Sequence, residues 1–289
     1  MKELVGTGVA IITPFKSDKS IDFSALERLI EYLITHGIDY IVALGTTGES
    51  ATLSKEEKKR VLHFIIEKVN GHVPIVAGFG GNNTKAVVES IQDYGDFSGI
   101  SAILSVAPYY NKPSQRGIIE HYKTIADVSP VPVILYNVPG RTKVNISAET
   151  TLELAQHKNI VAVKEASGNI EQIMQILKNK PREFMVISGD DALTFPLITL
   201  GASGVISVVA MARPTQTSNM VRYALEGEYD KARDIHYKLL DLIQAIFEDG
   251  NPSGIKAALH ILGLIENNLR LPLVPVKEET YEKIKNLLS

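Results

Sequence analysis

The chain of 289 residues contains no cysteine, which excludes disulfide bonds, a thiolate nucleophile and cysteine-ligated zinc or iron–sulfur centres. Its net charge is only −3 and its basic residues form no run of one sign, so nothing indicates binding to nucleic acid. The longest apolar stretch, residues 205–212, is far shorter than the roughly 18 residues of a membrane-spanning segment. The apolar run near the N-terminus is also too short for a secretory signal. These absences predict a cytoplasmic globular protein without membrane or nucleic-acid partners.

The chain instead has a series of eight short apolar runs with many β-branched residues. Their near-continuous hydrophobicity is typical of strands that are buried on both faces of a parallel sheet. Amphipathic segments separate them, and two of these segments begin with the capping-box pattern of a helix start, Ser24 with Glu27 and Ser54 with Glu57. The apolar runs lie at 8–12, 40–44, 74–78, 101–106, 132–136, 160–164, 184–188 and 204–208.

Eight strand–helix units in series predict an α/β fold, a (β/α)8 TIM barrel over residues 1–225. The strand signal then stops, and helical patterns predict a C-terminal helical extension over residues 226–289 that packs on the barrel. Its helices are expected at 228–247, 253–264 and 278–288. A doubly wound open sheet is the main alternative, but no G-x-G-x-x-G turn follows the first strand.

The sixth apolar run ends abruptly in Lys164. In a barrel of this kind the active site lies at the carboxyl ends of the strands, so this run would deliver an amine to the site. Apolar neighbours would deprive the amine of hydration and favour its neutral, nucleophilic form. The structural alternative is a lysine that reaches solvent from the strand end or pairs with Glu165.

Other strand ends carry hydroxyl groups, a guanidinium and acidic residues. Threonines between glycines offer hydrogen-bond donors to a carboxylate, a strand-end tyrosine can carry protons, and an arginine can bind a carboxylate. Each could also be an ordinary turn, packing or surface residue, and the acidic pair is expected to cap a helix. They are Thr46 and Thr47 after the second strand, Tyr109 and Tyr110 after the fourth, Tyr136 and Arg141 after the fifth, and Asp190 and Asp191 after the seventh.

No histidine or cysteine falls at a strand end, so no metal ion is expected. No other cofactor is expected either. One amine, several hydroxyl groups and an arginine around one rim suit Schiff-base chemistry on a carboxylated carbonyl compound. In this interpretation Lys164 attacks the ketone, hydroxyl groups transfer protons, and Thr46 and Thr47 hold the carboxylate.

Several motifs resemble those of the dihydrodipicolinate synthase family, which belongs to the pyruvate-dependent class I aldolases. The resemblance extends over nearly the whole chain, and Arg141 distinguishes the synthases from the sialic acid lyases of the same superfamily. The motifs are GTTGES at 45–50, PYYNKPS at 108–114, YNVPGRT at 136–142, VKEAS at 163–167, SGDD at 188–191, GVISV at 204–208 and NPSGIK at 251–256.

The resemblance implies a lyase that condenses pyruvate with L-aspartate 4-semialdehyde in the diaminopimelate route to lysine. Pyruvate would form an imine with Lys164, and Thr47, Tyr110 and Tyr136 would form a proton relay in which Tyr136 is the principal acid and base. Arg141 would bind the carboxylate of the semialdehyde.

By the same resemblance, main-chain groups of Gly189 and Ile206 would line the imine pocket. Tyr110 would come from a neighbouring subunit, which implies a homo-oligomer. A homotetramer built as a dimer of dimers is expected.

The resemblance also implies an allosteric lysine pocket, with one departure. Lysine-inhibited relatives carry histidine where this chain has Lys55 and Lys58, and glutamate where it has Ala86. We therefore expect weak or absent feedback by lysine. The other positions of the pocket still fit and are Ser50, Ala51, Asn82 and Tyr109.

Two alternative functions remain open from the residues. One is a different pyruvate aldolase or a 2-keto-3-deoxy acid lyase on the same scaffold. The other is a non-catalytic ligand-binding barrel in which Lys164 is inert.

Overall fold

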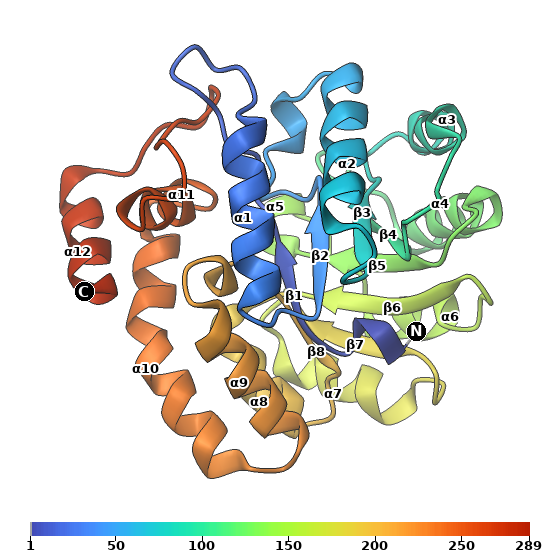
Figure 1. Ribbon diagram of the computed structural model, residues 1–289. Helices are drawn as coiled ribbons and strands as arrows, with labels where there is room; N and C mark the ends of the chain where they lie inside the picture. Colours follow the sequence, from blue (N-terminus) through green and yellow to red (C-terminus); the bar gives the residue numbers. More distant parts are fainter. Residues whose placement is uncertain (1) are drawn as a thin grey trace.

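The computed structural model describes residues 2–289 and contains a closed barrel of eight parallel strands. Each strand pairs with the next along the chain, and β8 pairs with β1 through Gly6 and Gly204 (Figure 1). The predicted (β/α)8 barrel is therefore confirmed. The strands are β1 (Gly6–Ala10), β2 (Tyr40–Ala43), β3 (Ile75–Gly78), β4 (Ala102–Val106), β5 (Val133–Asn137), β6 (Ile160–Glu165), β7 (Met185–Ser188) and β8 (Gly204–Ser207).

The strands are buried on both faces, which explains why their apolar runs do not alternate with polar residues. In β6, Ala162 points into the barrel and packs with Ile134 of β5, whereas Val163 packs against the surrounding helices. Because side chains alternate along a strand, Lys164 and Tyr136 lie on the same interior face as Ala162 and Ile134. The fold thus directs both candidate residues into the barrel.

The helices between the strands cover the outside of the barrel (Figure 1). They are α1 (Phe23–Thr35), α2 (Lys55–Val69), α3 (Thr84–Tyr94), α4 (Gln115–Val128), α5 (Pro139–Thr142), α6 (Ala148–Leu154), α7 (Ile170–Asn179), α8 (Thr194–Thr199) and α9 (Pro214–Leu225). Four 3-10 turns accompany them, η1 (Lys2–Leu4), η2 (Ser50–Thr52), η3 (Asp191–Leu193) and η4 (Val209–Met211).

One of the two predicted capping boxes is confirmed and the other is wrong. Ser54 and Glu57 exchange the two hydrogen bonds of a capping box at the start of α2. Ser24 lies inside α1 instead, because the carboxylate of Asp22 accepts from the Ala25 N–H and starts the helix earlier. Aspartate is as good an N-cap as serine, so Asp22 can start the helix two residues before Ser24.

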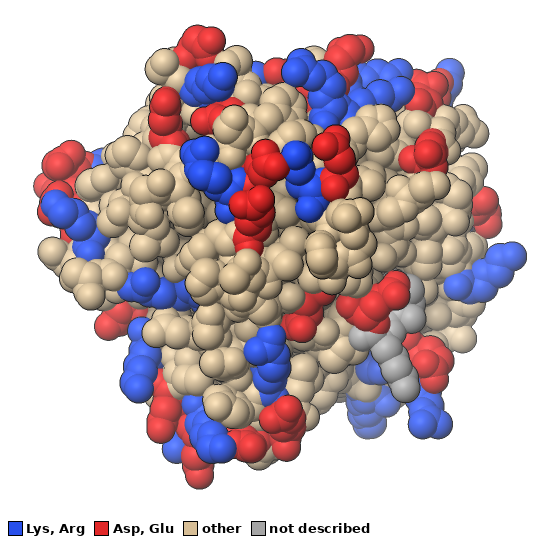
Figure 2. Space-filling model, viewed as in Figure 1, with Lys and Arg blue, Asp and Glu red and all other residues tan. Residues whose placement is uncertain are grey.

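Three helices at the end of the chain form the predicted extension, α10 (Tyr229–Glu248), α11 (Ser253–Ile261) and α12 (Glu278–Leu288). They lie along one side of the barrel, where α10 packs on α9 and α11 contacts η4 (Figure 1). No helix among residues 2–289 combines the length and hydrophobicity that crossing a membrane requires. Basic and acidic side chains are interspersed on the face that Figure 2 shows.

Candidate active site

A buried lysine and a buried tyrosine lie side by side at the carboxyl ends of β5 and β6. Tyr136 and Lys164 occupy paired positions of these strands. The Lys164 amine lies 4.3 Å from the centre of the Tyr136 ring, and the side chains are 6% and 7% exposed. The alternative in which Lys164 reaches bulk solvent is therefore wrong. A buried amine in contact with an aromatic ring is a candidate nucleophile with a candidate proton carrier beside it.

Glu165 does not pair with Lys164, because successive residues of a strand point to opposite faces. Its carboxylate accepts from Asn137 Nδ2 at 3.0 Å and from the Ser167 N–H at 2.7 Å on the outer side of the barrel. Burial raises the pKa of Glu165, and these hydrogen bonds oppose the rise. The contact joins β5 to β6 directly behind Tyr136 and Lys164, so it holds the two strand ends in register.

The threonine loop after β2 faces the same space as the lysine. Thr46, Thr47, Tyr136 and Lys164 line one cavity of about 110 Å³. Thr47 is buried, whereas Thr46 is exposed. The loop is fixed to the segment after β1 by Thr13, whose hydroxyl donates to the carbonyl of Gly48 at 2.7 Å. The structure thus brings the predicted carboxylate-binding hydroxyls together with the predicted nucleophile.

A residue of the C-terminal extension completes this loop. Asn251, just before α11, donates from Nδ2 to the hydroxyl oxygen of Thr47 at 2.9 Å. Its main-chain carbonyl accepts from the guanidinium of Arg141 at 3.2 Å. Reasoning from the residues missed Asn251, which appeared only within the NPSGIK motif. No local pattern signals it, since it lies 204 positions from Thr47.

Arg141 lies in α5 and lines a neighbouring cavity of about 410 Å³ together with Thr46 and Tyr109. Thr46 also lines the lysine cavity, so the two spaces meet at the threonine loop. Arg141 does not line the lysine cavity but borders the adjoining space. A second carboxylated molecule could approach the lysine cavity from that side.

Gly189 follows β7 and lies against the side chain of Lys164. A Cβ atom at this position would lie 3.1 Å from both Cγ and Cε of Lys164, so only glycine leaves this space open. Ile206 of β8 faces the barrel interior with Tyr136. The acidic residues nearby are structural, as expected: Asp190 caps η3, and Asp191 accepts from the N–H groups of Val208 and Val209.

Tyr110 stands apart from the cavities of this chain. Its side chain is 88% exposed, and its φ of 72° lies in the left-handed region. Its neighbour Tyr109 is 43% exposed and lines two cavities. Within residues 2–289, Tyr110 therefore does not meet Lys164, Tyr136 or Thr47.

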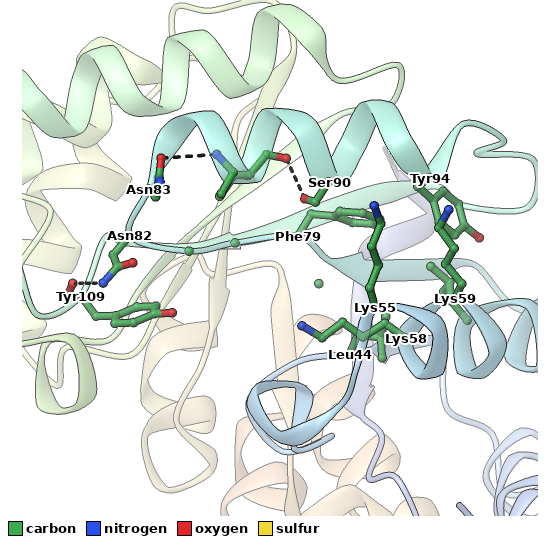
Figure 3. A pocket seen from close by; sticks show the side chains of 16 residues that line it. Leu44, Lys55, Lys58, Lys59, Phe79, Asn82, Asn83, Ser90, Tyr94 and Tyr109 are labelled. Atoms are coloured by element: carbon green, nitrogen blue, oxygen red, sulfur yellow. Dashed lines mark hydrogen bonds between the residues drawn. The ribbon is translucent and has the colours of Figure 1, made fainter.

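The positions expected to form an allosteric pocket divide between two cavities. Lys55, Lys58, Asn82, Ala86 and Tyr109 line a cavity of about 320 Å³, which Figure 3 shows from close by. Ser50 and Ala51 line the Arg141 cavity instead, and Ser50 also lines the lysine cavity. Lys58 borders both of these spaces and the lysine cavity as well. Lys55 pairs with Asp93 at 2.5 Å.

A closed parallel barrel with an amine at a strand end defines the class, a (β/α)8-barrel protein with a lysine as candidate nucleophile. The chain belongs to the dihydrodipicolinate synthetase family, whose sequence model matches residues 3–289. The resemblance of the motifs is thereby confirmed.

Individual relatives are similar over their whole length. The chain is 57% identical to 4-hydroxy-tetrahydrodipicolinate synthase of Parabacteroides distasonis, over 99% of this chain and 96% of that protein. The crystal structure of dihydrodipicolinate synthase from Aquifex aeolicus has a TM-score of 0.94 at 42% identity and covers 99% of this chain and 97% of that one. A structure of the enzyme from Cyanidioschyzon merolae with lysine bound has a TM-score of 0.95 at 38% identity, with coverage of 99% and 97%.

Proposed function

We propose that Lys164 is the imine-forming residue of a 4-hydroxy-tetrahydrodipicolinate synthase. The chain has the activity of its family, the condensation of pyruvate with L-aspartate 4-semialdehyde in the diaminopimelate route to lysine, and is a lyase. The single observation that supports the residue assignment is the buried Lys164 amine beside Tyr136, facing a cavity that Thr46 and Thr47 also line.

The reaction begins when the neutral amine of Lys164 attacks C2 of pyruvate and water leaves, which gives an imine. The protonated imine withdraws electrons, so a C3 proton is lost and an enamine forms. The enamine C3 then adds to the aldehyde carbon of the semialdehyde. Finally the amino group of the semialdehyde attacks C2, closes a six-membered ring and releases Lys164.

The surrounding residues divide the remaining tasks. Tyr136 is the principal acid and base, since proton carriers must lie within hydrogen-bond reach of the reacting atoms. Thr46 and Thr47 hold the carboxylate of pyruvate, and Thr47 also belongs to the proton relay. Arg141 binds the carboxylate of the semialdehyde from the adjoining cavity, because a guanidinium suits a carboxylate. Main-chain groups of Gly189 and Ile206 line the imine pocket.

Reduction with borohydride in the presence of pyruvate tests the assignment. We expect a single reduced adduct on the Lys164 peptide, and none on the buried Lys256, which serves as an internal control. Absence of the adduct would instead favour a non-catalytic ligand-binding barrel. An adduct without condensation of the semialdehyde, but with cleavage of a keto-deoxy acid, would identify a different pyruvate aldolase.

The proposal extends to the oligomeric state of the protein and to its location in the cell. A homotetramer, arranged as a dimer of dimers, would bring Tyr110 of one subunit into the relay of another, which suits its 88% exposure. Sedimentation at assay concentrations tests this, and Tyr110→Phe should lower kcat only in the assembled form. We also propose a cytoplasmic location, to be tested by cell fractionation.

Feedback by lysine is proposed to be weak or absent. The α-ammonium group of a lysine ligand would meet Lys58 in the 320 Å³ cavity and would find no carboxylate at Ala86. Among residues 2–289, no acidic side chain forms an ion pair with Lys58. An inhibition curve tests this, and micromolar sensitivity to lysine would refute it. The variant Lys55→His/Lys58→His/Ala86→Glu should increase the sensitivity.

A further inference from the structure

The threonine loop ends in a residue whose backbone is conformationally demanding. Glu49 has a φ of 51°, in the left-handed region that non-glycine residues seldom adopt. Such a conformation persists only where the surroundings determine it. For Glu49 those surroundings are the interactions of its side chain.

The Glu49 carboxylate is completely buried and has two partners from the C-terminal part of the chain. One oxygen forms an ion pair with Lys256 of α11, whose side chain is also 0% exposed. The other accepts from the main-chain N–H of Arg270 at 3.1 Å. The loop that carries Thr46 and Thr47 is therefore fixed to a segment more than 200 positions away.

Lys256 is held as firmly as its partner. Its amine donates to the carbonyl of Asn268 at 2.9 Å and lies 4.2 Å from the centre of the Phe15 ring. Burial lowers the pKa of Lys256 to about 8, and the nearby charge of Glu49 opposes this effect. Removal of the Glu49 charge would thus leave a buried ammonium group without its counter-ion.

The segment that leads into α11 carries a second contact to the threonine loop. Asn251 lies five positions before Lys256 and donates to the hydroxyl of Thr47, two positions before Glu49. The loop and the start of α11 are consequently joined at two points. If the Glu49–Lys256 ion pair is removed, the Asn251–Thr47 hydrogen bond alone has to hold the loop against the start of α11.

We propose that Lys256 is a positioning residue, which acts through Glu49 to hold Thr46 and Thr47 against the lysine cavity. A role in stability alone explains the pair poorly, because buried ion pairs are often no better for stability than apolar side chains of similar volume. This inference rests on the proposed roles of Lys164 and the threonines.

The test compares Lys256→Met, Glu49→Gln and the double variant with the wild-type chain. Lys283→Met is the matched control, since Lys283 pairs with Glu248 at 2.7 Å on the half-exposed surface of the same extension. Active sites are counted by borohydride trapping at saturating pyruvate, and kcat and KM are expressed per trapped site. Thermal unfolding of each variant is recorded in parallel.

We expect each single variant to raise the KM for pyruvate at least fivefold and to lower kcat at least tenfold per site. The control should stay within twofold for both constants. The double variant should regain thermal stability relative to the single variants, because no unpaired charge remains, but should keep the altered KM and kcat.

Wild-type constants per site in both single variants would overturn the inference, as would their full restoration in the double variant. Failure of all three variants to fold would also overturn it, since the pair would then serve folding itself. Absence of the pyruvate adduct in the wild-type chain would overturn the proposed function and this inference together.

Discussion

Replacement of Gly189 by alanine should disturb the nucleophile without unfolding the barrel. The new Cβ would lie 3.1 Å from Cγ and Cε of Lys164 and 2.8 Å from Cβ of Ala166. Carbon atoms in good contact are about 3.5–4.0 Å apart, so Lys164 has to move by roughly 0.4 Å or more. A displacement of about 1 Å at a reacting group can lower the rate about 100-fold. We therefore expect kcat to fall roughly 10- to 100-fold.

The assay separates this effect from simple destabilisation. Overpacking costs about 1–3 kcal/mol of folding free energy, which leaves a barrel of this size largely folded at room temperature. The rate of borohydride trapping with pyruvate should fall along with kcat, since both depend on the position of the amine. Gly140→Ala is the control, because a Cβ there meets no atom within 4 Å. Wild-type kcat in Gly189→Ala would refute the reasoning.

Three further predictions concern Lys164, Arg141 and His121. Lys164→Ala should retain the circular dichroism of the native fold but lose orders of magnitude in kcat, and near-wild-type turnover would reject the assignment. Arg141→Met should raise the KM for the semialdehyde at least tenfold and change that for pyruvate less than threefold; equal changes would contradict the proposed division of substrates. Burial lowers the pKa of His121 to about 4. The unfolded chain then binds a proton first as the pH falls, so the free energy of unfolding should decrease between pH 6.5 and 4 by at most about 3 kcal/mol. Urea titrations of His121→Leu should lack this contribution, and an unchanged pH dependence would refute it.

The strands and the strand-borne residues could be predicted from the sequence because their signals are local. An apolar run such as 160–163 identifies a buried strand, and the side-chain alternation along it fixes the direction of Lys164. The eight observed strands all lie within about two residues of the predicted runs. The helix start at Asp22 could not be predicted, because Asp22 and Ser24 are both good N-cap residues and the sequence does not rank them.

The contacts of the C-terminal extension could not be predicted in this way. The sequence of α11 gives no sign that the ammonium group of Lys256 is buried. The sequence around its partner Glu49 is typical of a solvent-exposed turn. Only the closure of the barrel, which determines where α11 lies, brings these residues together. The extension was expected to pack on the barrel, but its contribution of Asn251 to the site was not foreseen.

The site therefore consists of two parts that are held in different ways. Lys164 and Tyr136 are fixed by the hydrogen-bond ladder of β5 and β6, and the Asn137–Glu165 contact stabilises the register behind them. Thr47 lies on a loop and Arg141 in the short helix α5, outside the strand ladder, and both instead contact Asn251. In the proposed mechanism, imine formation needs the first part, whereas recognition of two carboxylates needs the second. Because the supports are separate, a change in the C-terminal extension can alter substrate recognition while the lysine remains in place.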